Sequence, residues 1–201
     1  MFNRRKLLLG SAVLAAAPAS ALAVAPSQEP PSQGPSTAAL ALARAALARR
    51  SDAITARDRI AIADFSLNAT QARFHIVDLN SGKTRSYLVA HGKGSDPAHT
   101  GWLQSFSNAP GSEATSRGAY LTGETYTGQH GLSRRLIGLD ADNSNALSRA
   151  IVIHSAWYVS ADMAAKGQLG RSQGCFAVSQ RDLAEVMDLM GPGRLLVAVK
   201  T

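Results

Sequence analysis

Apolar and polar positions alternate over short segments through most of the chain. From residue 59 onward, short runs rich in β-branched and aromatic side chains are separated by Gly, Asn and Asp, which is typical of strands. Asn80-Ser81-Gly82 lies between two such runs and predicts a hairpin. The predicted strands are residues 59–66, 73–79, 84–90, 102–106, 118–123, 134–139, 150–154 and 195–200.

Two segments carry a helical pattern instead. Residues 37–50 are filled with alanine and leucine, and Ser36 or Thr37 can cap their start. Residues 181–190 place apolar side chains on one stripe, after a capping-box-like pair formed by Ser179 and Asp182. Many short strands and few helices predict a mainly β fold, sandwich-like or barrel-like, with a few peripheral helices. The strands follow one another too closely for alternating parallel crossovers.

Residues 1–23 have the features of a secretory signal peptide. A positively charged head precedes an apolar stretch that is too short to span a membrane, and Ala21-Leu22-Ala23 matches the A-x-A cleavage pattern. The adjacent Arg4 and Arg5 also suit the twin-arginine route, so the general and the twin-arginine export routes both stay open. We therefore expect an exported protein of the periplasm or cell envelope.

The rest of the chain divides into a linker and one domain. Proline and small polar residues over 24–36 predict a flexible linker, and residues 37–201 form one domain with a sizeable core. Loss of residues 1–23 removes three basic residues, so the net charge falls by three, from +7 to +4. The sequence holds no Lys/Arg run and no interleaved aromatic platform, so nucleic acid is not an expected partner. No later apolar run is long enough for a membrane span.

The chain has one cysteine, Cys175, which makes an internal disulfide impossible. In an exported protein such a residue is buried and inert, forms an intermolecular bond, or is a working thiol. Gly174 before it allows a sharp turn and close approach of a substrate. The backbone N–H groups of Gly174 and Cys175 are candidate donors to a developing oxyanion.

A thiol needs a base to react near neutral pH, and histidine is the usual one. Of the five histidines, His154 is nearest to Cys175 along the chain and ends the buried-type run 150–153. The carbonyl or hydroxyl of Ser155 can orient its imidazole. The spacing alone leaves an inert pair equally open: a satisfied strand-end histidine and a small buried hydrophobe.

An ordered set of motifs extends this interpretation. Ile153-His154-Ser155 is followed by Ser172-Gln173-Gly174-Cys175, and upstream blocks include Ser116-Arg117-Gly118-Ala119-Tyr120 and Gly123-Glu124-Thr125-Tyr126. With these motifs the chain resembles the YkuD-type L,D-transpeptidases, specifically the murein L,D-transpeptidase catalytic domain subgroup, over roughly residues 58–200. Two positions depart from the wider family, which has histidine at the place of Gln173 and arginine or asparagine at the place of Ala177.

The resemblance implies the YkuD-type fold and an acyl transfer on peptidoglycan stem peptides without metal or organic cofactor. Cys175 would be the nucleophile and His154 the base, supported by Ser155 and Gly174. A thioester would form with release of D-Ala, and an amine acceptor would give a 3→3 cross-link. Water as acceptor would make the protein an L,D-carboxypeptidase, and a lysine of an envelope protein would give a covalent tether.

Residues near the motifs are candidates for substrate contacts, although packing or solvated-loop roles are equally open for them. These candidates are Tyr120, Trp157, Tyr158, Arg171, Ser172 and Gln173. Two other classes of function compete. A metal hydrolase would draw ligands from histidines such as His91 and His99, but no H-E-x-x-H or comparable pair is present. A non-catalytic envelope-binding module would account for Gln173 and Ala177.

Overall fold

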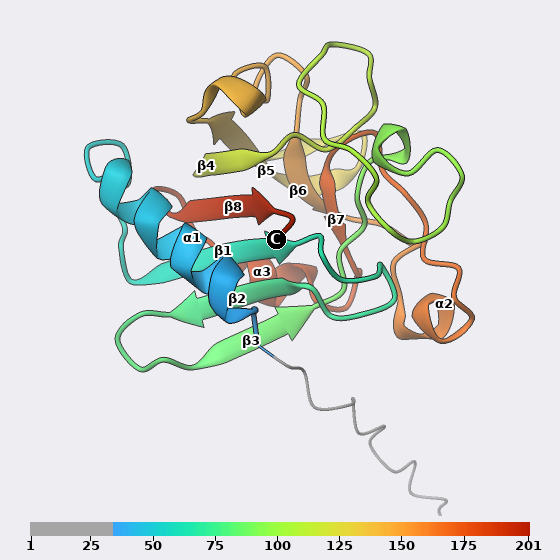
Figure 1. Cartoon of the computed structure of the whole chain (residues 1–201), viewed down its shortest axis with the longest axis horizontal. Coiled ribbons are helices and arrows are strands. Elements are labelled where there is room, and N and C mark those ends of the chain that lie inside the picture. The colour runs from blue at the N-terminus through green and yellow to red at the C-terminus, as the bar shows by residue number, and fades with distance from the viewer. Residues whose placement is uncertain (1–33) are drawn as a thin grey trace, which may run out of the picture. The chain divides into compact units, whose positions relative to one another are not determined.

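The computed structural model describes residues 34–201, in which eight strands form one mixed sheet (Figure 1). The predicted signal peptide and residues 24–33 of the predicted linker lie outside the described residues. The helices are α1 (Thr37–Arg49), α2 (Ala161–Ala165) and α3 (Leu183–Leu189), with the 3-10 turns η1 (Lys93–Ser95) and η2 (Ala141–Asn143). The strands are β1 (Arg59–Asp64), β2 (Phe74–Asp78), β3 (Thr84–Tyr87), β4 (Gly118–Gly128), β5 (Gly131–Gly138), β6 (Val152–Ser155), β7 (Phe176–Val178) and β8 (Leu195–Val199).

The strand order is β3-β2-β1-β8-β4-β5-β6-β7. Most neighbours are antiparallel, including the predicted β2–β3 hairpin, while β1–β8 and β6–β7 are parallel. Beyond β3, the Ala90 N–H donates to the Ala177 carbonyl of β7 at 2.9 Å. The chain leaving one edge of the sheet thus bonds to the strand at the other edge. This bridge joins the two edges of the sheet. The eight-stranded sheet and the small number of helices confirm the mainly β prediction for the described residues.

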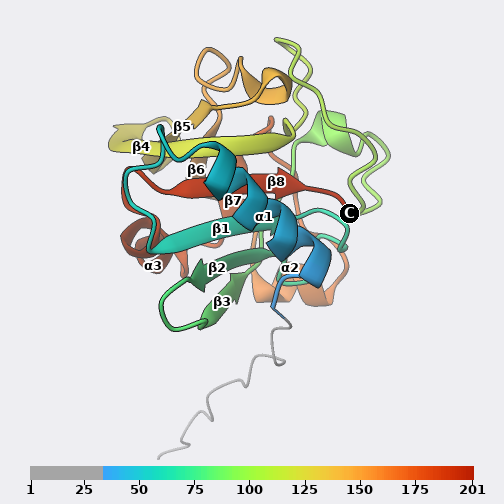
Figure 2. The same ribbon diagram turned by 60° about the vertical axis from the view of Figure 1, so that its left-hand side comes forward.

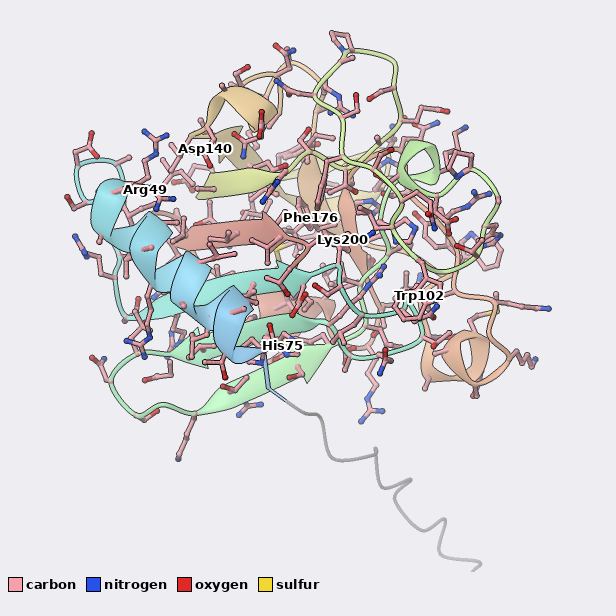
Figure 3. The ribbon with its side chains drawn as sticks, in the orientation of Figure 1. Arg49, His75, Trp102, Asp140, Phe176 and Lys200 are labelled. Carbon is pink, nitrogen blue, oxygen red and sulfur yellow. The ribbon has the colours of Figure 1, made fainter. Side chains whose placement is uncertain are left out.

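Each face of the sheet packs against a helix. In β1, Ile60 and Ile62 pack on the face covered by α1, while Ala61 and Ala63 belong to the core on the other face, as the two-residue strand period requires. Figure 2 shows α1 lying across β1 and β8. The opposite core receives the apolar side of α3 and the ring of Phe176, which lies in the interior (Figure 3).

The two predicted helices form where their caps indicated. The Ser36 Oγ accepts the N–H of Ala39 at 3.1 Å at the start of α1, and its hydroxyl also donates to Asp64 at 3.1 Å. Before α3, the Ser179 Oγ accepts the N–H of Asp182 at 3.1 Å. Over residues 34–201, no helix is both long and apolar enough to cross a membrane.

Two sequence predictions need correction, and two short elements, α2 and β7, were missing from the prediction. Residues 102–106 form a loop, because the backbone N–H groups of Gln104 and Ser105 bond to the Ser95 carbonyl instead of a strand. The sixth strand begins at Val152, since Ala150 has a φ of 51° and cannot continue a strand. The three-residue strand β7 was not predicted at all.

Candidate active site

The β6–β7 pair brings the backbones of Cys175 and His154 near each other. In this parallel pair Ile153 lies opposite Phe176 and His154 lies opposite Ala177. Ile153 and Phe176 both belong to the core beneath, so alternation turns His154 and Ala177 toward the other face. One further two-residue step back from Ala177 places Cys175 on that face. Because paired strands lie about 4.8 Å apart, the backbones of residues 154 and 175 are diagonal neighbours across this pair.

The imidazole of His154 is oriented by its own strand. Its Nδ1 lies 2.8 Å from the carbonyl oxygen of Ser155, which can only accept, so Nδ1 carries the proton in the neutral ring. Nε2 is then the basic nitrogen. The side chain is 2 % exposed, and burial lowers the pKa of His154 below its usual value. The predicted orienting role of Ser155 therefore belongs to its backbone carbonyl.

The ring of a second histidine, His130, covers the ring of His154. The rings of His130 and His154 stack with centroids 4.3 Å apart and planes 20° apart. His130 is exposed in the two-residue turn between β4 and β5, where Gly128 pairs with Gly131. Its proximity, after burial, further lowers the pKa of His154. No pattern in the sequence links His130 to this site, because the link depends on β5 pairing with β6, where Ser133 lies opposite His154.

Cys175 is 8 % exposed, and its thiol points at the segment just before β6. Its Sγ lies 3.5 Å from the Ala150 carbonyl. Burial raises the pKa of Cys175, and the backbone N–H of Val152 and the charge of Arg149 oppose that rise. Thiol and imidazole are therefore both uncharged at neutral pH, an arrangement suited to general-base activation of the thiol.

The turn before the nucleophile requires glycine. Gly174 has a φ of 118°, and a Cβ there would lie 2.8 Å from both the Ala114 carbonyl oxygen and the Ile151 Cδ1. Its N–H donates to the Ser172 Oγ at 3.1 Å, and that hydroxyl donates to the Cys175 carbonyl at 2.6 Å. The Gly174 N–H is thus engaged within the loop, which corrects its predicted role as an oxyanion donor. The Cys175 N–H remains a predicted donor.

A family model described as L,D-transpeptidase catalytic domain matches residues 32–199, most of the chain. The chain belongs to this family. No curated protein matches it.

Solved structures of two L,D-transpeptidases and of one cell shape determining protein resemble the chain only distantly. One from Mycobacterium tuberculosis H37Rv has 13% identity and a TM-score of 0.45, over 71% of this chain and 57% of its own. One from Mycobacterium smegmatis has 14% identity and a TM-score of 0.44, over 71% and 58%. A variant of Pgp2, the helical cell shape determining protein of Campylobacter jejuni, has 15% identity and a TM-score of 0.46, over 77% and 53%. The chain therefore spans less than two thirds of each of these structures.

Within this L,D-transpeptidase domain, the three aromatic candidates for substrate contact differ in how exposed they are. Tyr120 is fully buried, its ring packs edge-on against Phe176, and its hydroxyl donates to the Ser116 carbonyl at 2.7 Å. It cannot wall a groove, which corrects that prediction. Tyr158 is half-buried and close enough to Cys175 that burial and the thiolate raise its pKa to about 12. Trp157 is 75 % exposed and lies edge-on against Tyr158.

The polar candidates also take different roles. Arg171 donates to the backbone carbonyls of Asp96 and Pro97, so it ties the loop after η1 to the nucleophile segment. Ser172 is buried, and its hydroxyl is engaged by Gly174 and Cys175, which corrects its predicted contact with substrate. Gln173 is exposed beside the nucleophile. Trp157, Tyr158, Arg171 and Gln173 thus remain the accessible candidates among those predicted.

The histidines considered as metal ligands do not form a metal-binding group in the described domain. Between residues 34 and 201, no group of three His, Cys, Asp or Glu side chains is arranged to hold a metal ion. His91 is instead bonded to Arg73 through Nδ1 at 2.6 Å, and His99 to the Leu169 carbonyl at 2.8 Å.

Proposed function

We propose that this domain is a cysteine-dependent L,D-transpeptidase that acts on peptidoglycan stem peptides. The family match supports a transpeptidase-type role in the cell wall. The observation that supports the mechanism is the β6–β7 register, which brings the backbones of Cys175 and His154 together, while the Ser155 carbonyl holds the Nδ1 of His154. In the proposed reaction Cys175 is the nucleophile and His154 the general base.

The proposed acylation moves one proton through His154. Nε2 takes the thiol proton as Sγ attacks the carbonyl carbon of the third stem residue. When the tetrahedral intermediate collapses, the amide C–N bond to D-Ala breaks and His154 returns the proton to the leaving amine. The product is a thioester on Cys175 and free D-Ala.

The second half-reaction resolves the thioester. An acceptor amine attacks the thioester carbonyl, His154 removes a proton from that amine, and the thiolate leaves and is reprotonated. The new amide is a 3→3 cross-link when the amine belongs to another stem peptide. Attack by water would give carboxypeptidase activity instead. This chemistry belongs with a protein of the periplasm or cell envelope, in line with the signal peptide expected from the sequence.

The test is release of D-Ala from a disaccharide-tetrapeptide by the full chain. Cys175→Ala should abolish release, and His154→Ala should slow it by about 10²–10⁴-fold, the usual contribution of a general base. His99→Asn is a matched control, because His99 is exposed and Asn tolerates its φ of 55°. Product masses distinguish cross-linked dimers from hydrolysed tripeptide. A folded wild-type protein that releases no D-Ala would instead favour the non-catalytic binding module.

A further inference from the structure

Arg149 precedes β6 and reaches under the nucleophile loop. Its Nη1 donates to the Ser107 carbonyl at 2.9 Å and to the Ser116 Oγ at 2.7 Å, and its Nη2 donates to the Ala114 carbonyl at 2.6 Å. These bonds fix the guanidinium against the loop that precedes β4. All three acceptors are neutral.

The guanidinium also lies beside the residues around the thiol. A Cβ built on Gly174 would be 3.1 Å from the Arg149 Nη2, so the cation packs directly against the peptide that precedes Cys175. The thiol in turn contacts the carbonyl of Ala150, the residue after Arg149. The guanidinium therefore packs against the residue before Cys175, and the thiol contacts the residue after Arg149.

The charge of Arg149 has no anionic partner in the described domain. No carboxylate there forms a salt bridge with it. Burial lowers the pKa of Arg149, while proximity to Tyr120 and Cys175 raises it. A half-buried cation that is bonded only to neutral acceptors is stabilised further when an adjacent group becomes negative.

The other groups that face the thiol carry no positive charge. Tyr120 approaches from β4 and Tyr158 from the loop before α2, and both are neutral hydroxyls whose pKa values are raised. The N–H of Val152 from β6 contributes a backbone dipole. His154 is neutral at neutral pH. Arg149 is thus the cation that acts on Cys175 in the described part of the chain.

We propose that Arg149 is a positioning residue that stabilises the Cys175 thiolate by its charge while the loop of residues 107–116 holds the guanidinium in place. The thiol would then be easier for His154 to deprotonate. The catalytic consequence rests on the proposed function, whereas the effect on the thiol is independent of it.

The single cysteine allows a direct test. The rate of alkylation of the full chain by iodoacetamide, followed against pH, reports the ionisation of Cys175 alone. Arg149→Gln should slow alkylation about tenfold at neutral pH and move the profile to higher pH, since an opposite charge nearby favours the thiolate. Arg149→Lys retains the charge but cannot form all three hydrogen bonds of the guanidinium, and its alkylation profile should stay near that of the wild type. Arg44→Gln removes an exposed charge from α1 as the control.

Each outcome decides the proposal. An unshifted profile for Arg149→Gln, or equal slowing by Gln and Lys, would assign Arg149 to loop structure alone and overturn the inference. If circular dichroism shows that Arg149→Gln is unfolded, Arg149→Met takes its place as the uncharged variant: a profile moved to higher pH supports the charge effect and an unshifted one overturns it. A shifted alkylation profile in a protein that releases no D-Ala would uphold the role of Arg149 while the proposed function fails.

Discussion

Replacement of Gly174 by alanine tests the geometry of the nucleophile turn. The substitution keeps a residue with a φ of 118° and brings a Cβ to 2.8 Å from the Ala114 carbonyl oxygen and the Ile151 Cδ1. Left-handed backbone costs an L-residue about 1–2 kcal/mol. Overpacking against backbone adds about 1–3 kcal/mol. We therefore expect Gly174→Ala to lower the free energy of unfolding by about 2–5 kcal/mol.

Gly111→Ala is the matched control. Gly111 has a φ of 74° and nothing within 4 Å of an added Cβ, so only the backbone term applies and the expected loss is about 1–2 kcal/mol. Equilibrium urea unfolding of both variants measures the difference. If the two variants lose unfolding free energies that agree within about 0.5 kcal/mol, the usual scatter for surface substitutions, the close packing described around Gly174 is refuted.

Two further predictions concern buried imidazoles. His130→Ala should raise the pKa of His154, because the substitution exposes the His154 ring and removes the electrostatic effect of His130 on it. An NMR titration of His154 measures this pKa. An unchanged pKa would show that the stacked ring has no electrostatic effect on His154. Burial lowers the pKa of His75 to about 4, so the folded state binds fewer protons than the unfolded state between about pH 4 and 6.5. Stability contributed by His75 is therefore complete above pH 6.5 and should fall by about 3 kcal/mol as the pH drops to 4. Urea unfolding of His75→Gln should lose that pH dependence, and an equal slope in both proteins would contradict the assignment.

Local patterning predicted most of the fold. Alternation identified β1, β2 and β3 closely, and capping residues placed α1 and α3 to within a few residues. Local patterning failed where contacts between segments distant in the sequence determine the secondary structure. Strand β7 is three residues long and exists because β6 and Ala90 pair with it, which no short window shows. Residues 102–106 are apolar enough for a strand, but their backbone bonds to the loop at Ser95.

The site was predictable only in part, for the same reason. The residue types and spacing singled out Cys175 and His154, whereas Tyr120 was misjudged because its sequence block does not show which way the ring points. His130 and Arg149 reach the site through contacts between segments that no sequence motif connects. The chemistry of Cys175 and His154 thus stays a prediction from the sequence, and the pairing of β5, β6 and β7 shows what surrounds these two residues.

The most direct measurement is the intact mass of the protein after brief exposure to the disaccharide-tetrapeptide donor without acceptor. The account predicts an added mass equal to the donor minus D-Ala, mapped by peptide digestion to Cys175 and absent from Cys175→Ala. An adduct on any other residue, or D-Ala release that persists in Cys175→Ala, would contradict it.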